Sequence, residues 1–301
     1  MQISIIGLGR MGANMARRWA RGGVNVIAFD QSADARASVA EANISAVATL
    51  ADAVHAQASP RIVWLMLPSG EITESTIDAV LPMLAKGDLL VDGGNANYKD
   101  TQRRAVKANA VGIEYADVGV SGGVWGLQNG YCVMAGGSAE SYARLQPYLE
   151  VLAPSKTQGI VHAGAVGAGH YAKMVHNGIE YGMMQALAEG FALMEAKKEF
   201  AMPVADIAEA WRDGSVVRSW LLDLTASALK KPDEIAAIAP YVADSGEGRW
   251  AVEAMVELGV PAPVTALALT TRFATQGRGD YAAKLLAQMR AGFGGHAVKK
   301  S

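Results

Sequence analysis

The sequence predicts an α/β protein in which a doubly wound, mainly parallel sheet domain is followed by an all-α domain. Short apolar segments alternate with helical stretches up to about residue 160, strand signals stop near Gly164, and a long helical segment follows. A chain of 301 residues with 51% hydrophobic residues is long enough for two cores. We therefore expect one domain over residues 1–164 and a second over residues 165–301.

Six apolar segments are the predicted strands. They are nearly continuous in apolar residues, as in ISII, NVIAF and IVWLML, which indicates burial on both faces of a parallel sheet. Turn sequences at residues 68–70 and 93–95 follow two of them, at the strand ends where doubly wound sheets bind ligands. The predicted strands are residues 3–6, 24–29, 61–67, 89–91, 114–118 and 131–134.

The second domain is predicted to begin with one long helix over residues 165–198, because this segment has few helix-breaking residues. Prolines and glycines then divide the remainder into four or five further helices of ordinary length. The predicted breaks are Pro203, Pro232, Pro261 with Pro263, Gly246, Gly248, Gly277 and Gly279.

Charge and cysteine content restrict the partners. With 27 basic and 29 acidic side chains there is no positive excess to attract nucleic acid, so a small-molecule substrate is expected. Cys132 is the single cysteine, which excludes an intrachain disulfide, and no apolar run approaches the roughly 18 residues that span a bilayer. Since MQISIIG lacks a signal-peptide pattern, we expect a cytoplasmic protein that binds no membrane.

The first thirty residues hold a dinucleotide-binding pattern. Gly7-Leu8-Gly9-Arg10-Met11-Gly12 matches G-x-G-x-x-G, follows an apolar strand, opens a helical segment and precedes a second strand that ends at Asp30. Its glycines permit a tight turn, close approach of the backbone to a pyrophosphate, and close packing of helix on strand. N–H groups at the helix start then bind the phosphates. These features predict a Rossmann-type nucleotide site.

Asp30 distinguishes between the two nicotinamide cofactors. A carboxylate accepts hydrogen bonds from a free ribose 2′-hydroxyl and repels a 2′-phosphate. Gln31 and Ser32 add no positive charge, although Arg36 on the next helix could turn toward a phosphate. NAD is therefore the expected cofactor, and use of NADP stays an alternative. Asp30 could instead cap the next helix, but Ser32 is better placed to do so.

The long helix carries reactive side chains on one face. Lys173, His176, Asn177 and Glu180 lie at relative positions 0, 3, 4 and 7, which share a face at 3.6 residues per turn. Oxidation of an alcohol needs a base, and a desolvated lysine serves once its pKa falls, so Lys173 is the candidate base. Glu180 is the candidate acid for a later protonation. Alternatively, this is a solvated face with ordinary surface charges.

Two glycine-rich loops carry further polar groups. Residues 92–95 and residues 119–126 follow predicted strands, and their glycines let backbone N–H groups reach an anionic oxygen. Asn95 and Ser121 add side-chain hydrogen bonds. We expect both loops to line a site for a polar substrate, although they could be only turns.

Three longer segments resemble the signatures of one enzyme family. They are VDGGNANYKDTQRR (91–104), GVSGGVWGLQNGYCVMAGG (119–137) and GAGHYAKMVHNGIEYGMMQALAEGF (167–191). In these segments, and over nearly the whole chain, the sequence resembles the decarboxylating 6-phosphogluconate dehydrogenases, in their shorter bacterial form. The resemblance implies oxidative decarboxylation of 6-phosphogluconate to ribulose 5-phosphate with reduction of a nicotinamide cofactor.

The resemblance also implies roles for individual residues. Lys173 becomes the general base and Glu180 the proton donor, with His176 and Asn177 beside them. No metal is expected, since the acids are scattered and the five histidines show no ligand spacing. The implied substrate contacts are Asn95, Ser121, Gly122, Gly123, His176, Asn177 and Tyr181, and the implied further cofactor contacts are Leu67 and Asn95.

The family binds the sugar phosphate with arginines of later helices and with the tail of a neighbouring subunit. Arg272, and Arg290 with His296 in MRAGFGGH, match this pattern and imply a homodimer or homotetramer. Residues 244–250 depart from it and lack the phosphate-binding lysine. Asp30 also departs from the NADP-binding members, which have a neutral residue there and an arginine at the position of Gln31. The latter departure favours NAD.

Two other interpretations stay open. A β-hydroxyacid dehydrogenase for a small unphosphorylated acid shares the nucleotide pattern, a Ser-Gly-Gly loop and a Lys-x-x-x-Asn helix. Glu180, Tyr181 and the tail with Arg290 and His296 separate the two, because a small acid needs neither C1 protonation nor a phosphate clamp. A non-catalytic, NAD-sensing module would also keep the fold, and the pair of Lys173 and Glu180 argues against it.

Overall fold

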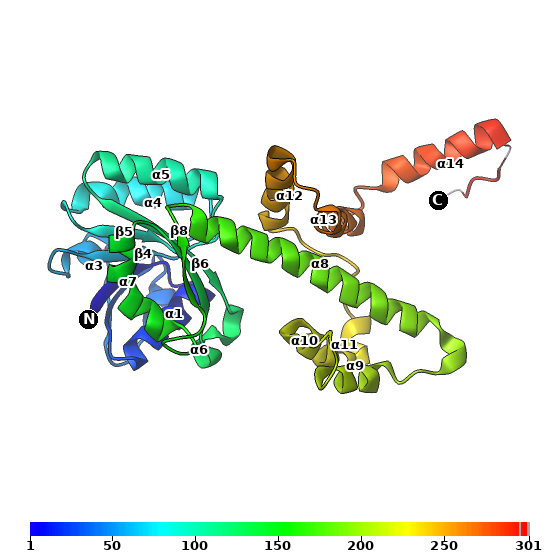
Figure 1. Ribbon diagram of the computed structural model, residues 1–301, viewed down its shortest axis with the longest axis horizontal. Helices are drawn as coiled ribbons and strands as arrows, with labels where there is room; N and C mark the ends of the chain where they lie inside the picture. Colours follow the sequence, from blue (N-terminus) through cyan, green and yellow to red (C-terminus); the bar gives the residue numbers. More distant parts are fainter. Residues whose placement is uncertain (295, 300–301) are drawn as a thin grey trace. The chain divides into compact units, whose positions relative to one another are not determined.

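The computed structural model describes residues 1–294 and 296–299 and divides into two compact units, Met1–Met174 and the residues from Val175 onward. The strands of the first unit are β1 Gln2–Ile6, β2 Asn25–Phe29, β3 Ile44–Ala46, β4 Ile62–Leu65, β5 Leu89–Asp92, β6 Glu114–Ser121, β7 Cys132–Gly136 and β8 Ile160–Gly164. They form one sheet (Figure 1). Its strand order is β3-β2-β1-β4-β5-β6-β7-β8. All strands are parallel except β7 and β8, which run in the opposite direction.

Helices cover both faces of this sheet. The helical segments are α1 Arg10–Arg21, α2 Ala33–Ser38, α3 Leu50–His55, α4 Glu71–Val80, η1 Leu81–Met83, α5 Tyr98–Ala110, η2 Gly123–Trp125, α6 Gly126–Asn129 and α7 Ala139–Leu152. α1 and α7 share one hydrophobic core through Trp19 and Leu149, whereas α3, α4 and α5 share another through Val54, Ile77 and Ala105. The predicted doubly wound architecture is confirmed.

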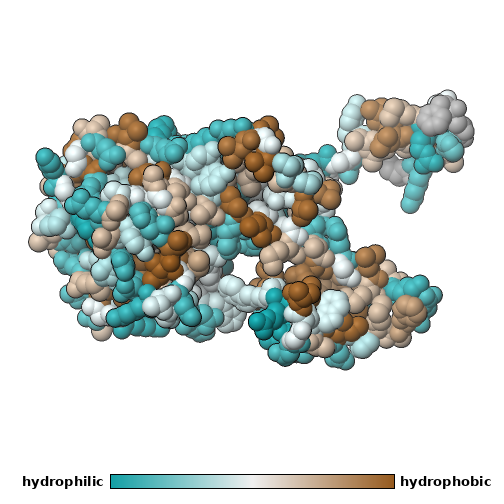
Figure 2. All heavy atoms as spheres, viewed as in Figure 1, coloured by the Kyte–Doolittle hydropathy of each residue, from teal (hydrophilic) through white to brown (hydrophobic). Residues whose placement is uncertain are grey.

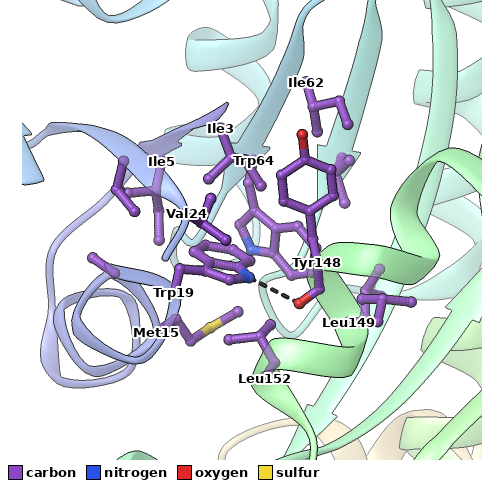
Figure 3. Close-up of a cluster of buried hydrophobic side chains, with 14 of the residues drawn as sticks. Ile3, Ile5, Met15, Trp19, Val24, Ile62, Trp64, Tyr148, Leu149 and Leu152 are labelled. Carbon is purple, nitrogen blue, oxygen red and sulfur yellow. Dashed lines mark hydrogen bonds between the residues drawn. The ribbon is translucent and has the colours of Figure 1, made fainter. Parts of the chain in front are cut away.

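The core under α1 and α7 is centred on two tryptophans (Figure 3). Trp19 of α1 and Trp64 of β4 are fully buried, and their rings meet edge to face with centroids 5.2 Å apart. This arrangement is favourable for aromatic pairs. Trp19 Nε1 also donates to the carbonyl oxygen of Tyr148 at 2.9 Å, which satisfies its buried N–H. These contacts fix α1, which begins within the glycine pattern, on the sheet.

The order of strands reverses between β1 and β4. From β1 the chain adds β2 and β3 on one side, and from β4 it adds the remaining strands on the other. Ligands of doubly wound sheets bind beside the carboxyl ends of the strands at such a switch point. The loops after β1, β4, β5 and β6 are therefore the segments from which a site can be built.

Two strands are missing from the prediction of six. β3 and β8 lie at the two edges of the sheet. β3 has only three residues and is partly to fully exposed, and β8 includes the exposed His162. Edge strands that contact solvent need no continuous apolar run, so the hydrophobic pattern does not reveal them.

Helices make up the remainder of the chain. They are α8 Ala168–Ala196, which begins in the first unit, η3 Lys198–Phe200, α9 Val204–Arg212, α10 Trp220–Leu229, α11 Pro232–Ala236, α12 Glu247–Leu258, α13 Pro263–Thr275 and α14 Asp280–Gly294. The expectation of four or five helices after the long one is wrong, because six α-helices, α9 to α14, follow within the described residues. The unpredicted break includes Gly214, at a φ of 79°, whereas Gly248 lies inside α12 and breaks nothing.

The helical unit has two small hydrophobic clusters. Phe191 of α8 packs with Ala208 of α9 and Leu222 of α10 in the first. Tyr181 of α8 packs with Leu269 of α13 in the second. Hydrophobic side chains also reach the surface of this unit, where Figure 2 shows them in brown. The exposed apolar residues include Leu193, Val256, Val264, Leu267, Leu285 and Leu286. Within residues 1–294 and 296–299, no helix has the length and apolar character needed to cross a membrane.

Candidate functional site

The predicted glycine loop joins β1 to α1, and its three glycines occupy different environments. Gly7 has a φ of 101°, and a Cβ there would overlap the carbonyl oxygen of Met66. A Cβ on Gly12 would overlap the carbonyl oxygen of Gly7. Gly9, the N-cap of α1, faces open space where a Cβ would project. The loop is therefore closely packed at Gly7 and Gly12 and open at Gly9, and this open space leaves room for a pyrophosphate to approach the backbone.

The first turn of α1 completes this loop. Leu8 is buried, Met11 packs against the hydrophobic core, and Arg10 begins α1 with an exposed side chain. This turn has no acidic residue, so no side chain in it repels an anion. Its backbone N–H groups, together with the positive end of the helix dipole, suit a phosphate group.

Asp30 follows β2, and its carboxylate is tied to the glycine loop. Oδ2 accepts a hydrogen bond from the N–H of Leu8 at 2.7 Å, and Oδ1 accepts one from the N–H of Ser32 at 2.8 Å. An ionised carboxylate has about four acceptor positions, so these bonds leave capacity for ribose hydroxyls. Arg36 donates to the carbonyl oxygen of Asp30 at 2.7 Å. Ser32 caps α2 by accepting the N–H of Ala35, as predicted.

The loops after β4 and β5 lie against each other. A Cβ on Gly94 would overlap the carbonyl oxygen of Leu67, so the two backbones are in direct contact. Leu67 itself packs against the core shared by α3, α4 and α5. Asn95 follows Gly94 and is exposed. The structure thus brings the two predicted cofactor contacts, Leu67 and Asn95, onto neighbouring loops.

A buried ion pair holds the start of the loop after β5. Arg104 of α5, which is 1% exposed, donates to Asp92 Oδ2 at 3.2 Å and to Glu74 Oε2 at 2.9 Å. Tyr115 donates its hydroxyl to the same Asp92 oxygen at 3.1 Å. Hydrogen bonds from Arg103, in the first place, and from Arg104 lower the pKa of Glu74 to about 2. Removing one partner of such a network leaves an uncompensated buried charge, so these contacts stabilise the loop.

The predicted Ser-Gly-Gly loop begins at the end of β6. Ser121 is the last residue of this strand and is partly buried. Gly122 and Gly123 then adopt φ values of 141° and 53°, which turn the chain into η2. The side-chain amide of Asn14 on α1 donates to the carbonyl oxygen of Val124 at 3.4 Å. The Ser-Gly-Gly loop is therefore linked to the helix that carries the glycine pattern.

Lys173 of α8 is packed against β6 and is only 8% exposed. A Cβ on Gly119 of β6 would overlap the Cβ of Lys173, so the missing side chain at Gly119 makes room for the lysine stem. The interpretation of Lys173 as an ordinary surface charge is therefore wrong. Gly119 and Ser121 lie on the same face of β6, because side chains of a strand alternate between its faces. Lys173 accordingly lies on the face of β6 that also presents Ser121.

His176, Asn177 and Glu180 follow Lys173 along α8. His176 Nδ1 is 3.0 Å from Asn177 Oδ1 and 3.8 Å from Glu180 Oε2. Asn177 is buried, whereas the side chains of His176 and Glu180 are each 39% exposed. A titratable group that keeps some contact with solvent can exchange protons with water, as an acid in turnover must.

Tyr181 and Arg272 are in contact within the helical unit. The guanidinium carbon of Arg272 lies 3.4 Å from the centroid of the Tyr181 ring, a cation–π contact. Arg272 also donates to the carbonyl oxygen of Ala243 at 3.1 Å. The hydroxyl of Tyr181 is 3.4 Å from Ser245 Oγ, which donates to Glu247. The segment that departs from the family pattern, residues 244–250, therefore contacts Tyr181, and the residue before it contacts Arg272.

Arg290 and His296 lie in the C-terminal segment. Arg290 is exposed near the end of α14, and His296 is exposed beyond it. Residue 295 of the MRAGFGGH motif is outside the described residues. Their role in a neighbouring subunit stays a prediction.

Sequence reasoning missed three polar residues that contact the predicted site residues or the start of their helix. Ser245 contacts the hydroxyl of Tyr181 and in turn donates to Glu247. Asp117 accepts a hydrogen bond from the first turn of α8. Asp117 offered one signal, a carboxylate inside an apolar strand. No group of three or more histidine, cysteine, aspartate or glutamate side chains in the described part of the chain is arranged to hold a metal ion.

A glycine loop with room for a pyrophosphate, bound to a carboxylate after the second strand, is typical of dinucleotide-binding proteins such as the nicotinamide-dependent oxidoreductases. Comparison with protein-family models identifies the family. Residues 2–164 match the NAD binding domain of 6-phosphogluconate dehydrogenase, and residues 169–299 match the 6-phosphogluconate dehydrogenase C-terminal domain. The chain belongs to the 6-phosphogluconate dehydrogenase family.

Individual relatives agree with this assignment. The NAD(+)-dependent, decarboxylating 6-phosphogluconate dehydrogenase of Haloferax volcanii is 37% identical over 301 residues, covering 100% of this chain and 99% of that protein. The decarboxylating 6-phosphogluconate dehydrogenase of Staphylococcus aureus is 36% identical over 90% of this chain, but the match spans only 61% of that longer protein. The solved Plasmodium falciparum 6-phosphogluconate dehydrogenase, studied with NADP+ and with 6-phosphogluconate, has a TM-score of 0.86 at 26% identity. That match covers 100% of this chain and 66% of the Plasmodium chain.

Proposed function

We propose that this protein oxidises and decarboxylates 6-phosphogluconate to ribulose 5-phosphate and CO2, with NAD as the preferred oxidant. The observation that carries the proposal is the burial of Lys173 against Gly119, on the strand that ends in the Ser121 loop. A base for a sugar hydroxyl must be shielded from water and close to groups that bind the substrate. Lys173 meets the first requirement, and its position along β6 supports the second.

The residues of the glycine loop and Asp30 fit a bound NAD. The open space at Gly9 and the first N–H groups of α1 would hold its pyrophosphate, and the Asp30 carboxylate would accept its ribose hydroxyls. When bound, NAD accepts the hydride from C3 of the substrate. Asp30 would repel a 2′-phosphate, so NADP is expected to be used less efficiently. Leu67 and Asn95 are the further proposed cofactor contacts.

Lys173 carries out the first proton transfer of the proposed mechanism. As a neutral amine it removes the proton of the C3 hydroxyl, which leaves a 3-keto acid. The carboxylate is then β to the new carbonyl, so the bond to CO2 breaks as the Lys173 ammonium protonates the carbonyl oxygen. The enediol that results receives a proton at C1 from Glu180 while its C2 hydroxyl gives a proton back to the neutral Lys173, which yields ribulose 5-phosphate. These steps balance without a metal ion.

The remaining predicted residues are proposed to bind the substrate. Asn95, Ser121, Gly122, Gly123, His176 and Asn177 bind the sugar acid. Tyr181 and Arg272 bind its phosphate, because a guanidinium matches the geometry of a phosphate group. Arg290 and His296 of a second copy complete this end, which makes the protein a homodimer or homotetramer. The exposed apolar side chains of the helical unit support such an assembly.

The proposed domain organisation follows the same division. Residues 1–164 form the NAD-binding domain, and residues 165–301 form the substrate-binding and oligomerisation domain. The proposed location is the cytoplasm. Size-exclusion chromatography with light scattering measures the mass of the assembly, and a monomer that turns over at full rate would contradict the shared site.

Initial rates test the reaction and the cofactor together. The expected result is that 6-phosphogluconate with NAD gives the highest kcat/KM, that NADP gives a lower one, and that ribulose 5-phosphate forms in equal amount to NADH. 3-Hydroxyisobutyrate and glycerate serve as controls. A higher kcat/KM for either small acid would replace the proposal by a β-hydroxyacid dehydrogenase. The absence of turnover with all three acids would favour a non-catalytic module.

A further inference from the structure

We propose that Asp117 is a positioning residue for Lys173, because it fixes the start of α8 on β6 and so sets the place of the base. The inference rests on the proposed function, since it concerns the base of that reaction. It assigns a role to a buried carboxylate that acts through Lys173.

The carboxylate of Asp117 binds the first turn of α8 with both oxygens. Oδ1 accepts a hydrogen bond from the N–H of Gly167 at 2.7 Å, and Oδ2 accepts one from the N–H of His170 at 2.7 Å. Asp117 is fully buried, and α8 begins at Ala168. The first N–H groups of a helix have no partner within the helix, and a carboxylate there is favoured by the helix dipole. Asp117 therefore caps α8 from a neighbouring strand.

The backbone of α8 also rests directly on the sheet. A Cβ on Gly169 would overlap the carbonyl oxygen of Met134 and would lie 2.9 Å from that of Asp117. Lys173 follows His170 after about one helical turn and contacts Gly119, two residues beyond Asp117 on the same strand face. Asp117, Gly119 and Ser121 thus lie in line on β6. The first binds the helix, the second admits Lys173, and the third begins the proposed substrate loop.

A second contact holds the same turn of α8. His170 is buried, and its Nδ1 lies 2.7 Å from Thr101 Oγ1 of α5. Thr101 Oγ1 is also 3.2 Å from the carbonyl oxygen of Asn97, so this hydroxyl joins the first turn of α8 to the start of α5. With one side of this turn held by α5, the Asp117 carboxylate determines how the other side meets β6.

Asp117→Asn tests the proposal because asparagine keeps the shape but not both acceptors. The Oδ1 of the asparagine can accept only one of the N–H groups of Gly167 and His170. Its NH2 group then faces the other N–H, and because two donors cannot bond, the start of α8 must move. A displacement of the catalytic group by about 1 Å can cost about a hundredfold in rate. We expect kcat to fall about tenfold to a hundredfold, with the KM for NAD changed less than threefold. The isotope effect on kcat with 3-deuterated 6-phosphogluconate should rise, because hydride transfer becomes limiting.

Asp88→Asn is the matched control. Asp88 is also fully buried and accepts N–H groups of Arg61 at 2.7 Å and Ala85 at 2.9 Å. It lies just before β5, at the amino end of that strand, whereas the loops of the proposed site follow the carboxyl ends of the parallel strands. Asp88→Asn should lower the melting temperature at least as much as Asp117→Asn, while its kcat stays within about threefold of the parent.

The kinetic comparison decides the outcome. A folded Asp117→Asn protein with kcat within threefold of the parent, or with no greater loss than Asp88→Asn, overturns the proposal. If Asp117→Asn does not fold, Gly119→Ala displaces Lys173 from the same strand, and an unchanged kcat in that variant overturns it equally. The parent enzyme is assayed first with 6-phosphogluconate and NAD. Failure there refutes the proposed function alone, and the variants are then compared with 3-hydroxyisobutyrate or glycerate, whichever the parent oxidises.

Discussion

Replacing Asp30 by Asn and Gln31 by Arg should shift the cofactor preference from NAD toward NADP. The Asp30 carboxylate accepts N–H groups of Leu8 and Ser32 at 2.7 and 2.8 Å. Asparagine has one acceptor oxygen, so it keeps one of these bonds and loses the negative charge that a ribose hydroxyl would meet. The arginine adds a donor for a 2′-phosphate next to it.

The size of the shift follows from the bonds involved. A hydrogen bond to a charged group contributes about 1.5–3 kcal/mol, against about 1 kcal/mol for a neutral pair. NAD therefore loses about 0.5–2 kcal/mol of binding, and NADP gains about 1.5–3 kcal/mol from the arginine–phosphate contact. Since about 1.4 kcal/mol is a factor of ten, the ratio of the two kcat/KM values should change roughly thirtyfold to several thousandfold.

Initial rates at saturating 6-phosphogluconate measure this ratio for the parent, for Asp30→Asn, for Gln31→Arg and for the double variant. The single variants separate the loss for NAD from the gain for NADP. Thermal unfolding serves as a control, because the lost bond to Leu8 or Ser32 lowers stability by about 1 kcal/mol without involving the cofactor. A ratio that stays within threefold of the parent, or an equal loss for both cofactors, would refute the role of Asp30.

Three further predictions concern the base, the acid and the stability of the loop after β5. Lys173→Met keeps an unbranched stem beside Gly119 and should abolish NADH formation while NAD still binds; residual activity within tenfold of the parent would exclude Lys173 as the base. Glu180→Gln should slow proton exchange at C1 of ribulose 5-phosphate more than hydride transfer, and equal losses would contradict the separate roles. The pKa of Glu74 is lowered by Arg103 to about 2, so its stabilising contribution is complete above its ordinary value of 4.5 and is lost as the pH falls toward 2. Urea unfolding at pH 5 and pH 3 should show a smaller loss of stability for Glu74→Gln than for the parent, and identical losses would argue against the ion pair.

The nucleotide half of the molecule could be predicted because its determinants are local. Gly7, Gly12 and Asp30 lie within one β–α–β unit, and each is required by a backbone approach or a charge that the spacing already specifies. The buried strands were predictable for the same reason, since burial on both faces demands continuous apolar residues. The edge strands β3 and β8 are under no such demand, and the sequence pattern does not reveal them.

The contacts that hold the residues of the proposed site in place could not be predicted, because they join segments that are distant in sequence. Asp117 binds amides 50 and 53 residues away, and Tyr181 meets Ser245 64 residues away. No spacing rule connects such pairs. Periodicity placed Lys173 on a face of α8, yet it could not distinguish a buried lysine from a solvated one. That distinction depends on the missing side chain of Gly119, on a strand that is remote in sequence.

The contacts proposed to select the cofactor and those proposed to place the base share no residue. Asp30 binds Leu8 and Ser32 near the ends of β1 and β2, whereas Lys173 depends on β6 through Gly119 and the Asp117 cap. Changes at distant positions without common partners are close to additive in free energy. Substitutions at Asp30 should therefore alter the preference between NAD and NADP without changing the pH dependence of the chemical step. Because the two proposed sets of contacts are separate, we expect cofactor preference and proton chemistry to respond to different substitutions in this chain.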